Sequence, residues 1–259
     1  HDLAGKHLGD VSLPGIGTVG GFGGKRSDAE TFYSFTGFTT PGEIYRFDAR
    51  TRTSTLFKKP TLAFDPAKFE TRQVFVTSKD GTKVPMFITH RKGLVLDGTN
   101  PTLLYGYGGF EVALNPGYSG SLGLAWLARG GVYVLANIRG GGEFGPAWHQ
   151  AAQGKNRQRA HEDFAAVAQD LIARKITSPR RLGIMGGSQG GLFMGVAMTQ
   201  HPELFNAAVI GVMWTVVLGL IGEQRRETIR TAIAQNDNLA FAFEQYATRT
   251  LESANVILQ

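Results

Sequence analysis

The sequence predicts an α/β fold built on a parallel sheet, with a small antiparallel sheet ahead of it. Two nearly continuous apolar runs, residues 102–107 and 132–138, are typical of strands that are covered on both faces. A helical stretch at residues 162–175 separates the second run from a third at residues 182–185, and so supplies the crossover that parallel strands need. The order continues with a helix at residues 191–199 and a strand at residues 207–212. This alternation indicates an α/β sheet.

The first 60 residues have the pattern of short antiparallel strands. Residues 31–36 and 43–48 alternate apolar and polar side chains, and a turn cluster at residues 39–42 separates them. Four such strands make one blade of a β-propeller. No second copy of the unit follows, so a single blade is predicted.

A domain boundary is predicted near residue 62. Residues 58–66 are rich in proline and charge, which is typical of a linker, and the hydrophobic pattern changes after them. Residues 73–78 and 83–90 then read as the strands of a hairpin, because Asp80-Gly81 between them is the strongest short hairpin signal.

Composition narrows the function classes. The chain of 259 residues is 42% hydrophobic and 19% charged, which is ordinary for a folded soluble protein. It has no cysteine, so disulfides, thiol catalysis and cysteine-ligated metals are excluded. No window reaches the roughly 18 apolar residues of a membrane span, and the first residues lack a signal pattern. We expect a cytoplasmic protein, with the periplasm as the alternative, and a true N-terminus before His1 because the initial Met is missing.

The formal charge of +6 raises the question of an anionic partner. The densest basic stretch, residues 155–181, also carries Glu162, Asp163 and Asp170 on the predicted helix. Mixed charges on one helix indicate a solvated helix face rather than a nucleic-acid footprint. We therefore expect neither nucleic acid nor a membrane as a partner.

One motif carries chemistry. Residues 181–185 read as a strand that runs directly into Gly186-Gly187-Ser188-Gln189-Gly190-Gly191, and a helical pattern follows. This is G-x-S-x-G in the strand-to-helix setting that it requires. Small residues are needed at both ends because the turn is strained and lifts the serine hydroxyl above the sheet. Ser188 is the predicted nucleophile, and the structural alternative is a Gly-rich turn without chemistry.

Several blocks of the sequence resemble the prolyl oligopeptidase family of serine peptidases, in the family's order. They are residues 78–87 (SKDGTKVPMF), 100–110 (NPTLLYGYGGF), 136–145 (ANIRGGGEFG) and 186–192 (GGSQGGL). The resemblance spans about residues 10–213. It implies an incomplete α/β-hydrolase-type sheet preceded by one β-propeller-like blade, and an enzyme that cleaves short proline-containing peptides on the carboxyl side of proline.

The resemblance also implies roles for four residues. Ser188 is the nucleophile, the Tyr107 hydroxyl and the backbone amide of Gln189 form the oxyanion hole, and Phe110 is a wall of the apolar pocket for the proline ring. Read without the family, Tyr107 and Phe110 would both be core residues. The family usually has Asn where this chain has Gln189, a change that keeps the backbone donor.

The rest of the catalytic triad is not found. A serine needs a base, normally a histidine held by a carboxylate, and in this fold the order is Ser, Asp, His. After Ser188 the chain has one histidine, His201, and one aspartate, Asp237, in the wrong order. His201 is predicted to be a surface residue at the end of the helix after Ser188, and Asp237 to lie in a turn.

The resemblance ends after Met213, where the family continues with Asp and here Trp214 follows. Two amphipathic helices are predicted at residues 222–235 and 239–254. A truncation, a reading-frame shift and a fusion would each explain this ending. The predicted domains are residues 1–61, part of a propeller's last blade; residues 62–213, part of a catalytic α/β-hydrolase domain; and residues 214–259, a divergent helical tail.

Three functions are open. The first is a serine peptidase acting after proline through a Ser188 acyl-enzyme, with little or no turnover in this chain. The second is a non-catalytic fragment or interaction module that keeps the fold without its base. The third is a general esterase of the same fold, which would not predict the N-terminal blade. The sequence does not predict an oligomeric state.

Two further motifs do not support a cofactor. Residues 15–20 match the dinucleotide pattern G-x-G-x-x-G, but no helix pattern follows them. His161-Glu162 begins a zinc-protease pattern whose second histidine would fall at Ala165. We expect neither a metal nor another cofactor.

Overall fold

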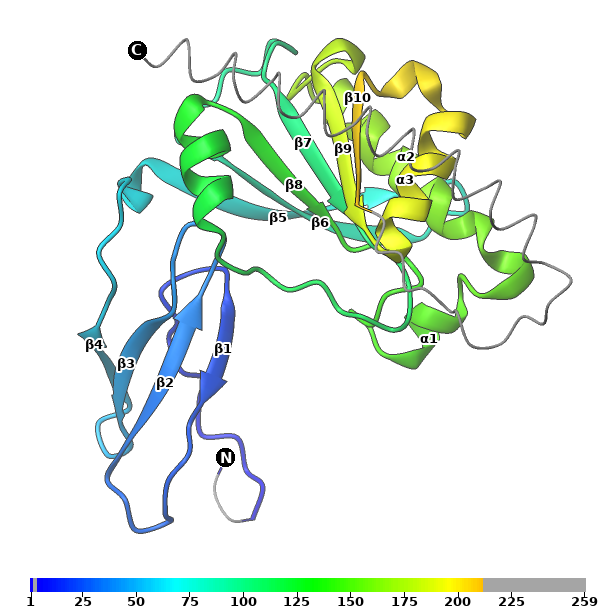
Figure 1. Cartoon of the computed structure of the whole chain (residues 1–259). Coiled ribbons are helices and arrows are strands. Elements are labelled where there is room, and N and C mark those ends of the chain that lie inside the picture. The colour runs from blue at the N-terminus through cyan, green and yellow to red at the C-terminus, as the bar shows by residue number, and fades with distance from the viewer. Residues whose placement is uncertain (2–3, 212–259) are drawn as a thin grey trace, which may run out of the picture. The chain divides into compact units, whose positions relative to one another are not determined.

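The computed structural model describes residue 1 and residues 4–211 of the chain. Within that part, four strands form an antiparallel sheet in the order β1-β2-β3-β4 (Figure 1). They are β1 (Thr18–Gly21), β2 (Glu30–Thr36), β3 (Glu43–Asp48) and β4 (Thr53–Lys58). The strands predicted at residues 31–36 and 43–48 are confirmed as β2 and β3.

Aromatic side chains fill one face of this small sheet. Tyr33 of β2 is buried, and its ring stacks on Phe22 and on Tyr45, with ring centroids 4.7 Å and 5.3 Å apart. The opposite face carries Phe32 and Phe57, which touch edge to face and stay exposed. Alternation along β2 therefore separates a buried face from an open apolar one.

The second sheet has six strands in the order β10-β9-β7-β8-β6-β5. The four strands from β10 to β8 are parallel, and the hairpin β5-β6 adds to β8 antiparallel. The strands are β5 (Phe69–Thr77), β6 (Lys83–Arg91), β7 (Thr102–Gly106), β8 (Val132–Ala136), β9 (Leu182–Gly187) and β10 (Ala207–Gly211). The predicted hairpin and the predicted parallel strands are confirmed. β10 forms one edge of the described sheet, and its Val209 and Ile210 side chains are exposed.

Helices α2 (Gln158–Ala173) and α3 (Gln189–Gln200) lie side by side over one face of this sheet (Figure 1). Between them and the strands lies the larger core, which includes the fully buried Phe164 of α2 and Phe193 of α3. A smaller apolar cluster on the other face includes Leu127, from the helical turn Leu127–Arg129. Both faces of β8 are buried, which explains why its sequence is continuously apolar. Val132, Val134 and Ala136 pack in the larger core. Tyr133 and Leu135 pack in the smaller cluster.

The prediction of a solvated face on α2 is wrong for Asp163. Its side chain is fully buried, because Arg139 and Ser78 from other elements bind it. Glu162 pairs with Lys79 and Asp170 with Arg174, and both carboxylates are partly exposed. The mixed charge pattern of this helix therefore did not distinguish the buried carboxylate of Asp163 from the exposed ones.

Helix α3 begins at Gln189, directly after Ser188, two residues earlier than predicted. A further short helix, α1 (Pro146–Gln150), was not predicted. The predicted helices at residues 222–235 and 239–254, and Asp237, lie outside the described residues.

Candidate active site

Ser188 occupies a single-residue turn between β9 and α3. Its backbone has φ 53° and ψ −119°, a conformation that is costly for a residue with a side chain. Its amide donates to the Gly211 carbonyl of the edge strand at 2.6 Å, and its carbonyl accepts from the amides of Gly191 and Leu192. The Ser188 residue is exposed. The strand-to-helix turn predicted from the motif is therefore present, and it presents the serine to solvent.

Backbone crowding explains the glycines around this serine. A Cβ atom on Gly186 would lie 2.5 Å from the Gly190 carbonyl oxygen, and one on Gly190 would lie 2.8 Å from the Gly106 carbonyl oxygen. A Cβ on Gly191 would meet the Gly211 carbonyl oxygen at 2.7 Å. Backbone atoms cannot turn aside as a flexible side chain can, so these positions require glycine.

Tyr107 lies beside this turn because of the strand order. Strands β7 and β9 are parallel neighbours, with Tyr105 opposite Met185, so their carboxyl ends meet at the same edge of the sheet. The Tyr107 ring carbon Cδ2 lies 3.4 Å from the position of a Cβ on Gly190, in the first turn of α3. Two residues on, a Cβ on Gly109 would meet the Gln189 side chain. Tyr107 and Gln189 thus lie in adjoining segments next to Ser188.

Phe110 is not a core residue. Its side chain is 72% exposed, and both Phe110 and Glu111 have positive φ, 53° and 57°. Successive residues in this conformation bend the chain sharply, and such strain persists only where neighbouring structure holds it. The phenyl ring is left free in solvent among the described residues.

The side chains of Arg157, Glu143 and Asn137 bind the two ends of the loop that runs from Tyr107 to Leu114. Arg157 donates from Nη1 to the Gly108 carbonyl. Glu143 accepts from the Leu114 amide at 3.0 Å through Oε1. Asn137 donates to the Leu114 carbonyl at 2.8 Å and to the same Glu143 oxygen at 3.1 Å. Sequence reasoning did not identify these three side chains, although Asn137 and Glu143 lie within one of the blocks that carry the resemblance.

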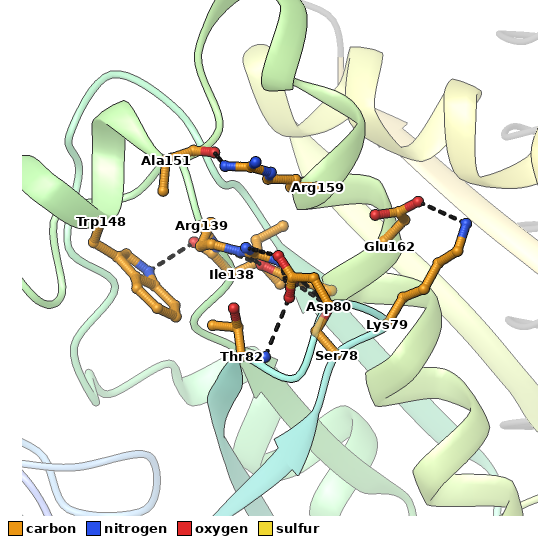
Figure 2. Close-up of polar contacts among 11 residues, drawn as sticks. Ser78, Lys79, Asp80, Thr82, Ile138, Arg139, Trp148, Ala151, Arg159 and Glu162 are labelled. Atoms are coloured by element: carbon orange, nitrogen blue, oxygen red, sulfur yellow. Dashed lines mark hydrogen bonds and ion pairs between the residues drawn. The ribbon is translucent and has the colours of Figure 1, made fainter.

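A buried ion network fixes the glycine-rich segment behind this loop. Arg139 binds Asp163 with three donors: its backbone amide at 3.0 Å, Nε at 2.9 Å and Nη2 at 2.6 Å. It also binds both carboxylate oxygens of Asp80 in the β5-β6 turn, and Ser78 donates to Asp163 at 2.5 Å. Figure 2 shows the Arg139 side chain beside Asp80, with the Trp148 indole donating to the neighbouring Ile138 carbonyl. The network joins the hairpin, α2 and the glycine-rich segment.

Electrostatics in the network favour the charged forms of its members. Hydrogen bonds from Arg139 hold the pKa of the Asp80 carboxyl well below its usual range. Hydrogen bonds to Asp163 in turn raise the pKa of Arg139 above its ordinary value. A buried guanidinium whose three nitrogens each donate to a carboxylate is the geometry in which such a pair can offset its desolvation cost.

The described histidines do not complete the site. His201 follows the last residue of α3, the far end of the helix from Ser188, and its Nδ1 lies 3.2 Å from a Glu203 oxygen. His149 Nδ1 lies 2.6 Å from the Gly140 carbonyl. His161 stacks on Phe193, and burial, with the nearby Arg157 charge, lowers its pKa to about 4. Within residues 4–211, no histidine hydrogen-bonds the Ser188 hydroxyl, and no group of three or more acidic or histidine side chains could hold a metal ion.

A serine at a strained strand-to-helix turn, on a largely parallel sheet covered by helices, defines the α/β-hydrolase class. Within that class the chain belongs to the prolyl oligopeptidase family: the family model matches residues 118–250. The model of that family's N-terminal beta-propeller domain matches residues 1–60, so the four-stranded sheet is a propeller blade. The first match extends past Met213, the last residue of the resemblance noted in the sequence. The assignment of residues 214–259 to a divergent helical tail stays a prediction.

Named relatives agree with the family. The chain is 50% identical over 202 residues to the uncharacterized peptidase y4nA of Sinorhizobium fredii, covering 78% of this chain and 28% of that protein. It is 42% identical over 212 residues to the prolyl endopeptidase of Elizabethkingia miricola, covering 82% of this chain and 30% of that protein.

Solved structures are similar as well. A prolyl endopeptidase studied for inter-domain dynamics in catalysis and specificity matches with a TM-score of 0.72 and 48% identity, over 80% of this chain and 30% of that one. A post-proline cleaving enzyme from Rickettsia typhi matches with a TM-score of 0.67 and 44% identity, over 75% of this chain and 28% of that one. The chain thus spans less than a third of the length of the relatives it matches. In the part of the chain that the structure describes, no helix is long and apolar enough to cross a membrane.

Proposed function

We propose that this chain carries the nucleophile half of a serine peptidase that hydrolyses short peptides on the carboxyl side of proline. The observation that carries the proposal is the exposed Ser188 turn, packed beside the segment that holds Tyr107. Membership of the prolyl oligopeptidase family supports the substrate class, because the relative from Elizabethkingia miricola is a prolyl endopeptidase.

In this mechanism the Ser188 oxygen attacks the carbonyl carbon that follows the proline ring. The serine proton passes to a base outside the described residues, and the carbonyl oxygen becomes an oxyanion. The Tyr107 hydroxyl and the Gln189 amide stabilise that charge. The Gln189 amide suits this role because it is the first in α3 and has no acceptor in the preceding turn. The amide bond then breaks, the amine leaves with a proton, and water hydrolyses the acyl-enzyme.

Phe110 supplies apolar surface for the proline ring. Its exposed phenyl ring lies only three residues after Tyr107 in the chain. A substrate whose carbonyl faces Tyr107 can therefore reach the Phe110 ring. A ring of this kind favours the flat, apolar face of a pyrrolidine over a charged side chain.

The chain as given is proposed to turn over little or no peptide, because no described histidine contacts Ser188. The lack of a described histidine at Ser188 also supports the second candidate, a non-catalytic fragment or interaction module. A general esterase is disfavoured by the propeller match at residues 1–60.

A graft tests the peptidase proposal. The residues of this chain that match the Elizabethkingia miricola prolyl endopeptidase would replace the matching segment of that enzyme. The graft is expected to hydrolyse a fluorogenic Gly-Pro peptide, and Ser188→Ala in the graft to abolish the activity. A folded graft that hydrolyses a simple ester but no proline peptide would favour the esterase. A folded graft with no activity on either would favour the non-catalytic module.

A further inference from the structure

Arg157 touches both halves of the candidate site. It stands one residue before α2, and its Nη1 donates to the carbonyl of Gly108, the residue after Tyr107. Its guanidinium carbon lies 5.5 Å from the centre of the Phe193 ring on α3, the helix that begins directly after Ser188. The Arg157 side chain therefore links the segment that holds Tyr107 to α3, the helix that begins after Ser188.

Arg157 keeps a partly buried side chain without a carboxylate partner among the described residues. In the described part of the chain Arg157 forms no ion pair, whereas Arg139 nearby binds two carboxylates. Within residues 4–211 its Nη2 atom is buried without a hydrogen-bond partner, which is an unusual cost for a guanidinium.

Gly140 makes the contact possible. A Cβ atom at that position would lie 2.8 Å from Arg157 Nη1 and would overlap the Gly108 carbonyl oxygen. His161, four residues along α2 from Arg157, stacks on the same Phe193 ring with centroids 4.2 Å apart. The Phe193 ring, the Arg157 guanidinium and the Gly108 carbonyl thus pack together.

We propose that Arg157 is a positioning residue that holds the Gly108 carbonyl against α3 and thereby directs the Tyr107 hydroxyl toward the oxyanion formed at Ser188. The inference rests on the proposed function for its catalytic consequence. Its structural part, that Arg157 restrains the segment from Tyr107 to Leu114, does not depend on that function. Arginine suits the task because its planar group donates to a carbonyl and packs on a ring at the same time, which a lysine ammonium does less well.

Hydrogen–deuterium exchange of the 259-residue chain tests the structural part. Arg157→Met keeps the length of the side chain but removes the donor and the charge, and it is expected to speed amide exchange in residues 107–114. The matched control is Arg159→Met, on the same helix turn, because Arg159 donates instead to the Ala151 carbonyl. Equal exchange in the two variants and the unsubstituted chain would overturn the proposal.

The reaction of Ser188 with a fluorophosphonate probe tests the catalytic part. Arg157→Met is expected to slow labelling about tenfold, since small displacements of a catalytic group have effects of this order or larger. Arg157→Lys should recover part of the rate, and Arg159→Met should match the unsubstituted chain. In a Tyr107→Phe background Arg157→Met should change the rate less than about twofold, because the hydroxyl it directs is already gone.

The outcomes separate the two proposals. An Arg157 effect of the same size with and without the Tyr107 hydroxyl would show that Arg157 does not act through it. If the unsubstituted chain labels no faster than Ser188→Ala, the same variants are compared in the graft, where peptide hydrolysis reports a working base. A folded graft that labels no faster than its Ser188→Ala variant overturns the proposed function, and the exchange experiment still decides whether Arg157 restrains the segment.

Discussion

The guanidinium of Arg139 and the carboxylate of Asp163 form a buried ion pair, with Nη2 2.6 Å from Oδ1 and Nε 2.9 Å from Oδ2. Their side chains are 4% and 0% exposed. The pair joins the glycine-rich segment behind Tyr107 to helix α2. The Arg139–Asp163 pair is therefore expected to be needed for the conformation of the candidate site.

Breaking this pair from one side is expected to be costly. Arg139→Met leaves the Asp163 charge buried without its partner, and should lower the free energy of unfolding by about 3–5 kcal/mol. Urea denaturation followed by circular dichroism measures the change. Arg72→Met removes an exposed ion pair with Glu70 and should cost less than about 1 kcal/mol. An Arg139→Met variant as stable as Arg72→Met would contradict the assignment.

Acid is expected to destabilise the chain through His161. The pKa of His161 is lowered to about 4 in the fold, while an unfolded histidine titrates near 6.5. The unfolded state therefore takes up the proton first, so stability is full above about pH 6.5 and falls as the pH drops toward 4. His161→Phe keeps a ring against Phe193 and should flatten this part of the curve. Urea midpoints at pH 7, 6, 5 and 4 measure it, and parallel curves for both proteins would contradict the prediction.

The glycine spacing of the Ser188 turn should be intolerant of a single methyl group. Gly190→Ala places a Cβ 2.8 Å from the Gly106 carbonyl oxygen, so we expect lower stability by about 1–3 kcal/mol and slower labelling of Ser188. Gly195→Ala, on the same helix in open space, is the control. It should leave labelling unchanged and stabilise the helix by up to about 1 kcal/mol. A loss of equal size at both positions would exclude crowding as the cause.

Removal of the Tyr107 hydroxyl should slow the chemistry without loosening the fold. Tyr107→Phe takes away one proposed oxyanion donor, an effect on the order of 10²–10³-fold in rate. Probe labelling of the chain and peptide hydrolysis by the graft both measure it. The matched control is Tyr105→Phe, in β7 two residues before Tyr107, and it should leave the labelling and hydrolysis rates almost unchanged. Equal effects of the two substitutions would remove Tyr107 from the mechanism.

The order of the elements could be read from the sequence because each signal is local. The continuous run of β8 and the Asp80-Gly81 turn depend on residues adjacent in the chain. The Ser188 turn was predicted for the same reason, since its glycines, strand and helix all lie within residues 182–200. The roles of Tyr107, Gln189 and Phe110 came from family resemblance and stay predictions.

The missed features depend on pairs that are distant in the sequence. Asp163 was read as solvated because its partners, Arg139 and Ser78, lie 24 and 85 residues away. Arg157 was missed in the same way, since its acceptor Gly108 is 49 residues away. Periodicity cannot reveal which charged residue on a helix meets a partner from another element; only the packed fold does.

Strand β10 carries a practical consequence for work with this polypeptide in isolation. Among the described strands none pairs with its outer edge, and Val209 and Ile210 of this strand are exposed. Edges of this kind recruit strands from other molecules. Preparations at high concentration are therefore expected to self-associate, and a lysine at position 209 is the simplest change for obtaining monodisperse material.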